Sequence, residues 1–482
     1  MPEPDVAVDL PALIADHASS GFSPSGMVAI AKRGEVVRFE PWGQDGYTPR
    51  SLFRVASCTK SFTALALLIL RRAGRLSLDD EIALHLPELT TEADGAWPVL
   101  RLRHLMSMSG GLATDNPWGD RQESIGREQL AAWMKGGLRL MFAPGSAYEY
   151  SNLGYALLGE VITRVSGQDY RQFVQQRIIE PLALQDTKFA GNGPDSVVPS
   201  YHREPLLPGR PGGWAWHEQS TPGAFSPMGG LYSSAHDMAA WANLFLERDV
   251  PGGVGFTPAD LLEAQQTQCL IGSDRAEAPL GGLVTTSYGF GLKIERYAEH
   301  GKLVSHAGGY PGFTAYMCWH EESGHAVIAS ANGSHSAAPA LARKVMLRLV
   351  AQEGPAAQSP APWGETLTAV ATLEDLVRSV GHLGAGALIE RFQAVFAENV
   401  ELDFPLARRV DYLQQALVSL GAVRPAGQAE PPVCEQPCRA RWHVPTELGR
   451  LELFIELMPV APFAVQTFSA VAVRGSSRVL LF

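Results

Sequence analysis

At 482 residues the chain is long for one hydrophobic core, so two domains are the default expectation. Hydrophobic residues make up 46% and charged residues 18%, which is typical of a globular protein and excludes a disordered or fibrous one. The net charge of -11 argues against nucleic acid or an anionic membrane as the main partner, and leaves small molecules, peptides and other proteins.

The N-terminal stretch MPEPDVAVDLPALIADH has neither a basic region nor a long apolar core, so we read no signal peptide in it. The most apolar run, FTALALLIL, is too short to span a bilayer. We therefore expect a cytoplasmic protein with no membrane partner. A helix is expected after Asp9, and GMVAIAKRGEVVRFEP predicts two strands joined in a hairpin at Arg33-Gly34.

Within the next stretch, FRVASCTKSFTALALLILRRAGRL, the run SFTALALLILRRAGRL is apolar on every side and predicts a buried helix. If this helix begins near Ser57, Lys60 lies on the same face as the serine, and hydroxyl and amine can meet. Burial and the positive end of the helix both disfavour the charged amine, and a neutral lysine can take the proton of a serine. The alternative is a serine N-cap followed by a solvated lysine, but the run that follows is too apolar for a solvated helix start.

The segment FAPGSAYEYSNLGYALLGEVITRVSG predicts a loop that enters a helix, with Ser151 as N-cap and Gly167 as the C-terminal stop. Near a cation, the hydroxyl of Tyr150 can act as general base and acid, and the amide of Asn152 can hold a substrate carbonyl. Alone, this motif is equally compatible with a core tyrosine beside a helix cap.

Three strand-like runs follow late in this part of the chain: KLVSHAGG, FTAYMCWH and HAVIASANG, before a helix over residues 335–352. Strands at both ends and helices between them suggest an α+β domain whose antiparallel sheet is assembled from both chain ends. His306 stands at the end of the first run, before Gly308 and Gly309, where bare backbone lets a substrate lie along the strand. A glycine turn after a buried histidine is the alternative.

The stretch EGPAAQSPAPWG has the composition of a linker, so we divide the chain into a domain of residues 1–352, a linker of residues 353–364 and a smaller domain of residues 365–482. In the smaller domain two helical stretches precede three strands, RARWHVP, RLELFIELMP and FAVQTFSAVAVR. That element order weakly resembles the NTF2-like domains. Formation of a homo-oligomer and covering of the active-site mouth are the roles we consider for it.

We expect no metal and no cofactor. CEQPC, residues 434–438, lacks a second ligand pair and is interpreted as a surface loop holding two thiols. In HEESGH, residues 320–325, the histidine spacing is one residue too long for a zinc protease, and we expect both histidines on the surface of a hairpin. The chain also lacks the G-x-S-x-G motif of α/β-hydrolases.

Serine-lysine, tyrosine-x-asparagine and a basic residue-x-glycine, in that order, resemble the three motifs of the penicillin-recognising serine hydrolases. The resemblance covers residues 10 to 350 and extends to stretches such as LSLDDEIALHLPEL, LRLRHLMSMSGGL and PMGGLYSSAHDMAAWANLFL. The members that the chain resembles are class C β-lactamases, D-alanyl-D-alanine carboxypeptidases, D-aminopeptidases and β-lactamase-like esterases. The fold that the resemblance implies is α+β, a β-lactamase/transpeptidase-like antiparallel sheet flanked by helices with a helical subdomain.

The resemblance also implies roles for the motif residues. The nucleophile is Ser57, Lys60 and Tyr150 share the proton transfers, and Asn152 contacts the substrate. His306 takes the basic position of the third motif, with Gly308 beside it. The backbone N–H groups of Ser57 and Gly309 form the oxyanion hole.

His306 is a departure, because true class C β-lactamases usually carry lysine there, and an imidazole holds a substrate carboxylate less firmly. We therefore expect a hydrolase that cleaves an amide, peptide or ester bond of a small molecule or short peptide, of the D-aminopeptidase, D-amino-acid amidase or carboxylesterase type. A β-lactamase or D-Ala-D-Ala carboxypeptidase is the alternative. A non-catalytic penicillin-binding-like sensor is a third hypothesis, and it predicts no acylation of Ser57. The loop of residues 116–123 and Tyr310 are candidates for the walls of the substrate pocket.

Overall fold

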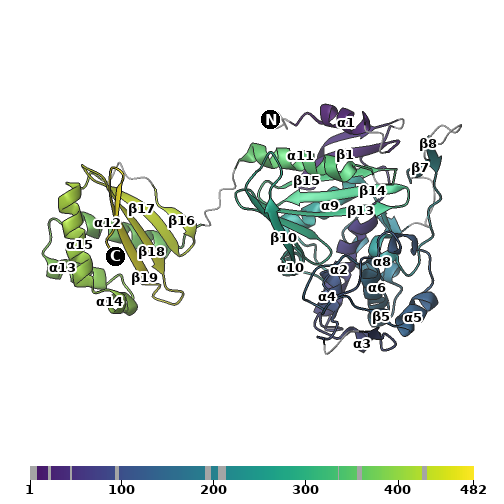
Figure 1. Ribbon diagram of the computed structural model, residues 1–482, viewed down its shortest axis with the longest axis horizontal. Helices are drawn as coiled ribbons and strands as arrows, with labels where there is room; N and C mark the ends of the chain where they lie inside the picture. The colour runs from purple at the N-terminus through teal and green to yellow at the C-terminus, as the bar shows by residue number, and fades with distance from the viewer. Residues whose placement is uncertain are drawn as a thin grey trace. The chain divides into compact units, whose positions relative to one another are not determined.

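A computed structural model of the chain describes residues 8–19, 23–43, 46–92, 97–189, 197–204, 213–334, 336–354, 361–425 and 431–482. The chain forms two compact units, Met1–Ala356 and Ala357–Phe482 (Figure 1). The predicted linker of residues 353–364 lies partly outside the described residues, because 355–360 are not among them. No described helix is long and apolar enough to cross a membrane.

The first unit is built on an eight-stranded sheet in the order β10-β11-β12-β13-β14-β15-β1-β2, with every neighbouring pair antiparallel. Its strands are β1 (Gly26–Lys32), β2 (Glu35–Trp42), β10 (Cys269–Arg275), β11 (Leu283–Tyr288), β12 (Lys293–Tyr297), β13 (Gly301–Tyr310), β14 (Phe313–His320) and β15 (His325–Ala331). The pairing of β1 with β15 joins the two ends of this unit, as the sequence predicted. The β1–β2 hairpin turns at Arg33 and Gly34, both with positive φ, which suits a two-residue turn.

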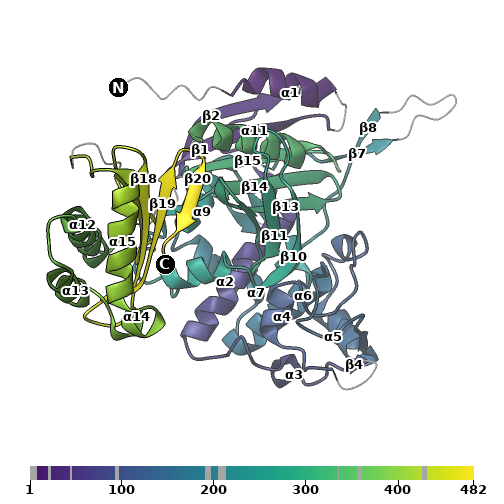
Figure 2. The ribbon, with the colours of Figure 1, turned by 60° about the vertical axis from the view of Figure 1, so that its left-hand side comes forward.

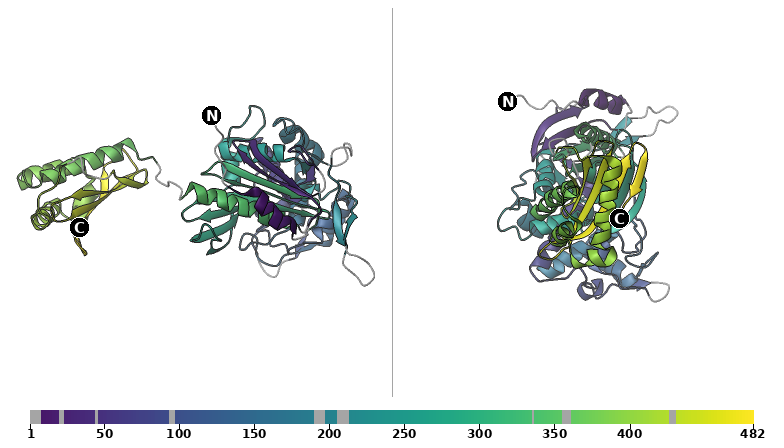
Figure 3. Two further views of the ribbon diagram at one scale, coloured as in Figure 1. Left: turned by 90° about the horizontal axis from the view of Figure 1, so that it is seen from above. Right: turned by 90° about the vertical axis from the view of Figure 1, so that its left-hand side faces the viewer.

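Alternate residues of the central strands serve two separate cores. In β1, Val28 and Ile30 pack with α1 (Leu10–Ser19) and α11 (Ala338–Glu353), whereas Met27 and Ala29 belong to the core on the other face. Figure 3 shows α1 and α11 side by side across the sheet. The opposite face is covered by α9 (Ala235–Glu247). A sheet covered on both faces explains why its central strands are apolar on both sides.

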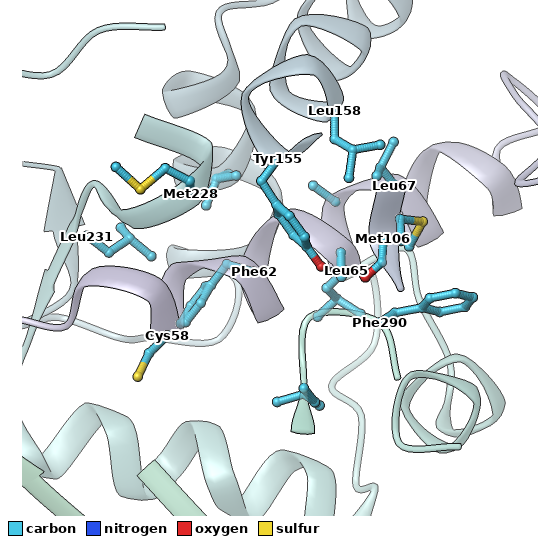
Figure 4. Packing of buried hydrophobic residues seen from close by; sticks show 14 of the residues in the cluster. Cys58, Phe62, Leu65, Leu67, Met106, Tyr155, Leu158, Met228, Leu231 and Phe290 are labelled. Atoms are coloured by element: carbon cyan, nitrogen blue, oxygen red, sulfur yellow. Dashed lines mark hydrogen bonds between the residues drawn. The ribbon is translucent and has the colours of Figure 1, made fainter. Parts of the chain in front are cut away.

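A helical subdomain lies at the end of the first unit away from α1 and α11 (Figure 2). Its central helix, α2 (Thr59–Arg72), is buried over twelve residues from Thr59 to Leu70 and packs against α6 (Asn152–Ser166). Figure 4 shows the contact, with Phe62 and Leu65 of α2 near Tyr155 of α6. The remaining helices of the unit are α3 (Ile82–His85), α4 (Leu102–Met106), α5 (Arg127–Gly136), α7 (Tyr170–Val174), α8 (Ser226–Gly229) and α10 (Pro258–Ala264), with short turns η1 (Ala56–Cys58), η2 (Gly119–Arg121) and η3 (Gln175–Ile179).

Small sheets complete the first unit. A three-stranded one, in the order β3-β9-β6, leads the chain into the candidate site. The strands of these sheets are β3 (Phe53–Arg54), β9 (Leu231–Ser233), β6 (Lys188–Phe189), β4 (Thr91–Glu92) with β5 (Leu138–Arg139), and β7 (Tyr201–Glu204) with β8 (Gly213–Trp216).

The second unit places helices on one antiparallel sheet, in the predicted order of helices first and strands after. Its helices are α12 (Gly364–Ser379), α13 (Ala385–Gln393), α14 (Glu398–Asp403) and α15 (Leu406–Leu420), and its strands, each paired with the next along the chain, are β16 (Val433–Gln436), β17 (Arg439–Pro445), β18 (Arg450–Leu457), β19 (Val465–Arg474) and β20 (Ser477–Leu480). Alternate residues of β17 and β18 are buried against the helices in a core of their own. The likeness to NTF2-like domains stays a prediction.

Two expectations about exposure were wrong. His320 and His325 lie in the hairpin between β14 and β15 but are only 3% and 6% exposed. His320 can be buried because Nε2 donates to the carbonyl of His300 and Nδ1 accepts from the N–H of Ser323, which satisfies a neutral ring. Cys434 is not in a surface loop: it lies in β16, is 3% exposed and belongs to the core of the second unit.

Candidate active site

A tight turn presents Ser57 at the head of the buried helix. β3 pairs with β9, and the chain then enters η1, where Ala56 has a φ of 44°. A residue other than glycine or asparagine adopts that conformation at a cost of about 1–3 kcal/mol, and such residues cluster at functional sites. The turn passes directly into α2, so Ser57 and Lys60 are three residues apart on a continuous helical path, as the sequence predicted.

Lys60 is completely buried, and its amine has three hydrogen-bond partners. Nζ lies 2.9 Å from Ser57 Oγ, 2.8 Å from Asn152 Oδ1 and 2.8 Å from the carbonyl oxygen of Met228. The amide and carbonyl oxygens can only accept, so they take the two N–H bonds of a neutral amine. The lone pair of that amine is then directed at the hydroxyl of Ser57, the one partner that can donate.

The surroundings of Lys60 favour this neutral state. Burial lowers the pKa of Lys60 to about 7, although the carboxylates of Asp120 and Asp115 oppose the shift. The rings of Tyr150 and Tyr155 lie beside the amine, with Nζ 4.9 Å and 5.5 Å from their centroids. The amine therefore sits in an aromatic and largely dry environment, in which it can gain and lose a proton near neutral pH.

The start of α6 places the second motif against Lys60. Ser151 is the N-cap and accepts from the N–H of Gly154 at 3.2 Å, as expected. Asp115, from the preceding loop, accepts from the N–H groups of Asn152 and Leu153 at 2.8 Å and 2.7 Å. The free backbone donors of this helix end are thus satisfied, and the helix start is fixed against the loop.

Asn152 is completely buried, and both ends of its amide are occupied. Oδ1 accepts from Lys60, and Nδ2 donates to Asp120 Oδ1 at 3.2 Å. Tyr150 is half-buried, and burial raises the pKa of its hydroxyl well above 10, opposed by a hydrogen bond with Ser57. The phenol is therefore protonated at neutral pH and shares the serine hydroxyl with Lys60.

The third motif lies on β13, next to Ser57. β12 pairs with β13 only as far as Ser305, so residues 306–310 have no partner strand on that side among the described residues. A Cβ on Gly308 would lie 2.3 Å from the carbonyl oxygen of Val55, so only glycine allows β13 to approach the turn that carries Ser57 this closely. Ala307 and Gly309 alternate with it and are exposed toward the site.

His306 is buried with both ring nitrogens engaged. Nδ1 lies 2.7 Å from the carbonyl oxygen of Ala307, so it carries the proton, and Nε2 accepts from the hydroxyl of Tyr288 at 2.8 Å. Burial, together with the charge of Lys60, lowers the pKa of His306 to about 3. The third-motif position therefore presents a neutral imidazole.

Two hollows meet at this site. The first has a volume of about 650 Å³ and includes Ser57, Tyr150 and His306 in its wall, and the second has about 760 Å³ and includes Arg121 and Tyr310. Asp120, Ala307 and Gly309 line both. Of the predicted wall residues, Tyr310 and part of the loop of residues 116–123 line these hollows, whereas Glu123 is buried in an ion pair with Arg54. Asp120 was not singled out from the sequence, and its only signal was its place in that loop.

Comparisons with known proteins identify the family and the fold of the chain. The family model described as Beta-lactamase matches residues 10–352. Protein flp of Staphylococcus aureus strain MRSA252 is 24% identical over 357 residues, which cover 70% of this chain and 65% of that protein. The chain thus spans about two thirds, or slightly less, of the length of the curated relatives it matches.

Two solved structures share the fold. A D-stereospecific amidohydrolase from Streptomyces sp. is 25% identical, with a TM-score of 0.53, and the match covers 71% of this chain and 98% of that one. An octameric penicillin-binding protein homologue from Pyrococcus abyssi is 19% identical, with a TM-score of 0.59. This second match covers 99% of the present chain and 100% of the archaeal one, so it includes the smaller unit.

Proposed function

The chain belongs to the beta-lactamase family of serine hydrolases, and on that premise we propose that it forms an acyl-enzyme at Ser57. In this proposal it cleaves an amide, peptide or ester bond of a small substrate, as a D-aminopeptidase, D-amino-acid amidase or carboxylesterase. The observation that carries the proposal is the buried amine of Lys60, 2.9 Å from Ser57 Oγ, with its two other partners unable to donate.

Acylation then follows from the contacts. Ser57 Oγ attacks the carbonyl carbon of the substrate while its proton passes to Lys60 Nζ, and the carbonyl oxygen becomes an oxyanion. When the tetrahedral intermediate collapses, the bond to the leaving group breaks and the leaving atom takes a proton. The hydroxyl of Tyr150 supplies it and recovers one from Lys60, because its raised pKa keeps it protonated between turnovers.

Deacylation reverses the roles. A water molecule attacks the ester carbonyl, its proton passes to Tyr150 and Lys60, and Ser57 leaves with a proton restored to Oγ. In both halves the N–H groups of Ser57 and Gly309 are proposed to donate to the oxyanion. Each donor of this kind contributes about 3 kcal/mol in related acyl transfer, comparable to the effect of the base.

The state of His306 supports a substrate without a carboxylate at the third motif. A carboxylate placed there would meet a neutral ring whose nitrogens are already hydrogen-bonded to Ala307 and Tyr288. β-Lactams and D-Ala-D-Ala peptides carry such a carboxylate, so we rank these substrates below amides and esters that lack it. The likeness to a D-stereospecific amidohydrolase points in the same direction.

We further propose that residues 365–482 form a separate small domain that joins copies of this chain into a homo-oligomer. The support is the octameric homologue, whose match extends over nearly the whole chain including this unit.

Side-by-side turnover of p-nitrophenyl butyrate and D-alanine p-nitroanilide tests the proposal, with Ser57→Ala as the control. Anilide turnover that disappears in the variant supports an aminopeptidase or amidase. Ester turnover alone supports a carboxylesterase. A Ser57→Ala variant as active as the parent, or no reaction with either substrate together with no acylation of Ser57 in mass spectra, overturns it.

A further inference from the structure

One charged side chain near the nucleophile has no place in the steps above. Asp120 lies on η2, is half-buried and lines both hollows of the site. Its carboxylate accepts from Asn152 Nδ2, whose Oδ1 in turn holds the amine of Lys60. A chain of three contacts thus leads from Ser57 Oγ to a carboxylate at the wall of the substrate space.

Within the part of the chain that the structure describes, no arginine or lysine nitrogen lies within ion-pair distance of Asp120. Burial raises the pKa of this carboxyl, and the amine of Lys60 opposes the shift. Asp115 is its acidic neighbour but is occupied as the cap of α6. The amide of Asn152 donates to this carboxylate and that of Asn116 can donate to both of its oxygens at 3.3 Å, yet a carboxylate has further acceptor capacity, which a cation from the substrate would satisfy.

In the second hollow the charge of Arg121 also opposes the raised pKa of Asp120, but within the described residues its guanidinium is not within ion-pair distance of that carboxylate. Lys293, in the first hollow, lies 3.2 Å from the buried carboxylate of Glu295. His306 is neutral and offers no free nitrogen. The positive group nearest the nucleophile is Lys60 itself, which must lose its charge to act as the base. A substrate carboxylate would be repelled here, whereas an ammonium would be attracted.

We propose that Asp120 is a specificity residue that binds a protonated amine of the substrate, so that the preferred acyl group carries a free amine next to the scissile carbonyl. This inference rests on the proposed function and names its substrate class. An α-amine is two bonds from the attacked carbon, and the contact chain from Ser57 through Lys60 and Asn152 ends at this carboxylate, which lines the same hollow as Ser57.

The test compares D-alanine p-nitroanilide with N-acetyl-D-alanine p-nitroanilide, which lacks the charge. We expect the parent to prefer the free amine at least about tenfold in kcat/KM, because the acetylated substrate leaves the carboxylate without its cation. Asp120→Asn is expected to remove this preference by raising KM for the free amine, while Asp120→Glu keeps part of it. Asp274→Asn, at the other carboxylate of the first hollow, is the matched control and should keep the preference.

Binding to the Ser57→Ala variant separates this inference from the proposed function, because it needs no turnover. Calorimetry should show D-alaninamide binding more tightly than N-acetyl-D-alaninamide, and the difference should vanish when Asp120→Asn is added. Equal affinities, or equal losses for both amides on Asp120→Asn, overturn the inference even if Ser57-dependent ester turnover is present. Tighter binding of the free amine through Asp120 without any acylation supports the inference and overturns the proposed function.

Discussion

At the scale of single residues, the chemistry of this site depends on which partners of Lys60 can donate. Asn152 Oδ1 and the carbonyl of Met228 are obligate acceptors, so they hold the amine whether it is charged or neutral. Only the contact with Ser57 changes with the proton: the charged amine donates to Oγ, and the neutral amine accepts from it. Deprotonation of Lys60 therefore switches the serine from an acceptor into an activated nucleophile.

The pH profile should show this switch. Because the pKa of Lys60 is lowered to about 7 and only the neutral amine is a base, kcat/KM should rise with pH through about 7. His306, with a pKa lowered to about 3, should contribute no limb between pH 5 and 9. p-Nitrophenyl butyrate is the substrate for this measurement, because it has no amine of its own to titrate.

The Asp120→Asn variant tests the assignment of this pH dependence to Lys60 in a second way. The Asp120 carboxylate favours the charged amine of Lys60, so its removal should lower the pKa of Lys60 further and move the acidic limb to lower pH. An acidic limb that moves to higher pH in Asp120→Asn would show that a group other than Lys60 titrates. A limb that stays near pH 7 in a Lys60→Arg variant with residual activity would show the same.

The motif residues could be predicted because their chemistry depends on sequence spacing. Ser57 and Lys60 are three residues apart on one helix, and Ser151 caps the next helix locally. The role of Asp120 could not be predicted, since its contact with Asn152 joins two segments that meet only in the folded subdomain. The positive φ of Ala56 was equally hidden, because alanine carries no sequence signal for that conformation.

At the scale of elements, the distance between β13 and the η1 turn determines whether the site can form. Gly308 packs on the carbonyl of Val55, which precedes the nucleophile Ser57 by two residues. Gly308→Ala should therefore push the strand away from Ser57, lowering the free energy of unfolding by about 1–3 kcal/mol and kcat with it.

Gly309→Ala is the matched control for stability. A Cβ there would meet no atom of the described residues within 4 Å, so the melting temperature of this variant should stay at that of the parent. If both variants lose equal stability, the close approach of β13 to Val55 is not what glycine provides.

A buried ion pair ties β3 to the loop that carries Asp115 and Asp120. Arg54 and Glu123 are 1% and 0% exposed and lie 2.9 Å apart, and the guanidinium also lies 3.4 Å from the ring centroid of Tyr310. Glu123→Gln keeps the shape but leaves the charge of Arg54 without its partner. We expect the free energy of unfolding to fall by about 3 kcal/mol, measured by urea denaturation.

Asp16→Asn is the control for that prediction. It removes the partner of Lys344 in an ion pair whose side chains are 75% and 52% exposed, and exposed pairs contribute about 0–1 kcal/mol. Equal effects of the two substitutions would mean that burial of the Arg54–Glu123 pair does not matter for stability.

The strands and helices that were predicted are present, because hydrophobic periodicity and turn residues are local, but the strands β10, β11 and β12 were not predicted. The hairpin at Arg33-Gly34, the cap at Ser151 and the run of late strands all follow this pattern. The exposure of His320 and His325 was predicted wrongly for a non-local reason. The polar sequence of the hairpin predicts that it is exposed. The ring of His320 can be buried because it bonds to the carbonyl of His300, which is twenty residues away in the sequence.

At the scale of the whole molecule, the two units have separate cores. The core residues of the first unit come from both faces of the eight-stranded sheet and from the helical subdomain, and those of the second lie between Ala369 and Ala470. The described residues that form the candidate site, from Ser57 to Gly309, all belong to the first unit. A domain with its own core can in principle fold alone.

Truncation after Ala356 should therefore leave a folded and active hydrolase. We expect residues 1–356 to melt cooperatively and to turn over p-nitrophenyl butyrate at the rate of the full chain, because every proposed catalytic group is retained. If residues 365–482 join copies of the chain, light scattering should find fewer copies per assembly in the truncated protein than in the full chain. Ser57→Ala at both lengths controls for contaminating esterases.

A truncated protein that keeps its oligomeric state but accepts larger substrates would favour the other role, in which the small domain covers the active-site mouth. Loss of folding or of activity would mean that the second unit completes the first. A truncated protein that keeps both its oligomeric state and its substrate range would remove both roles.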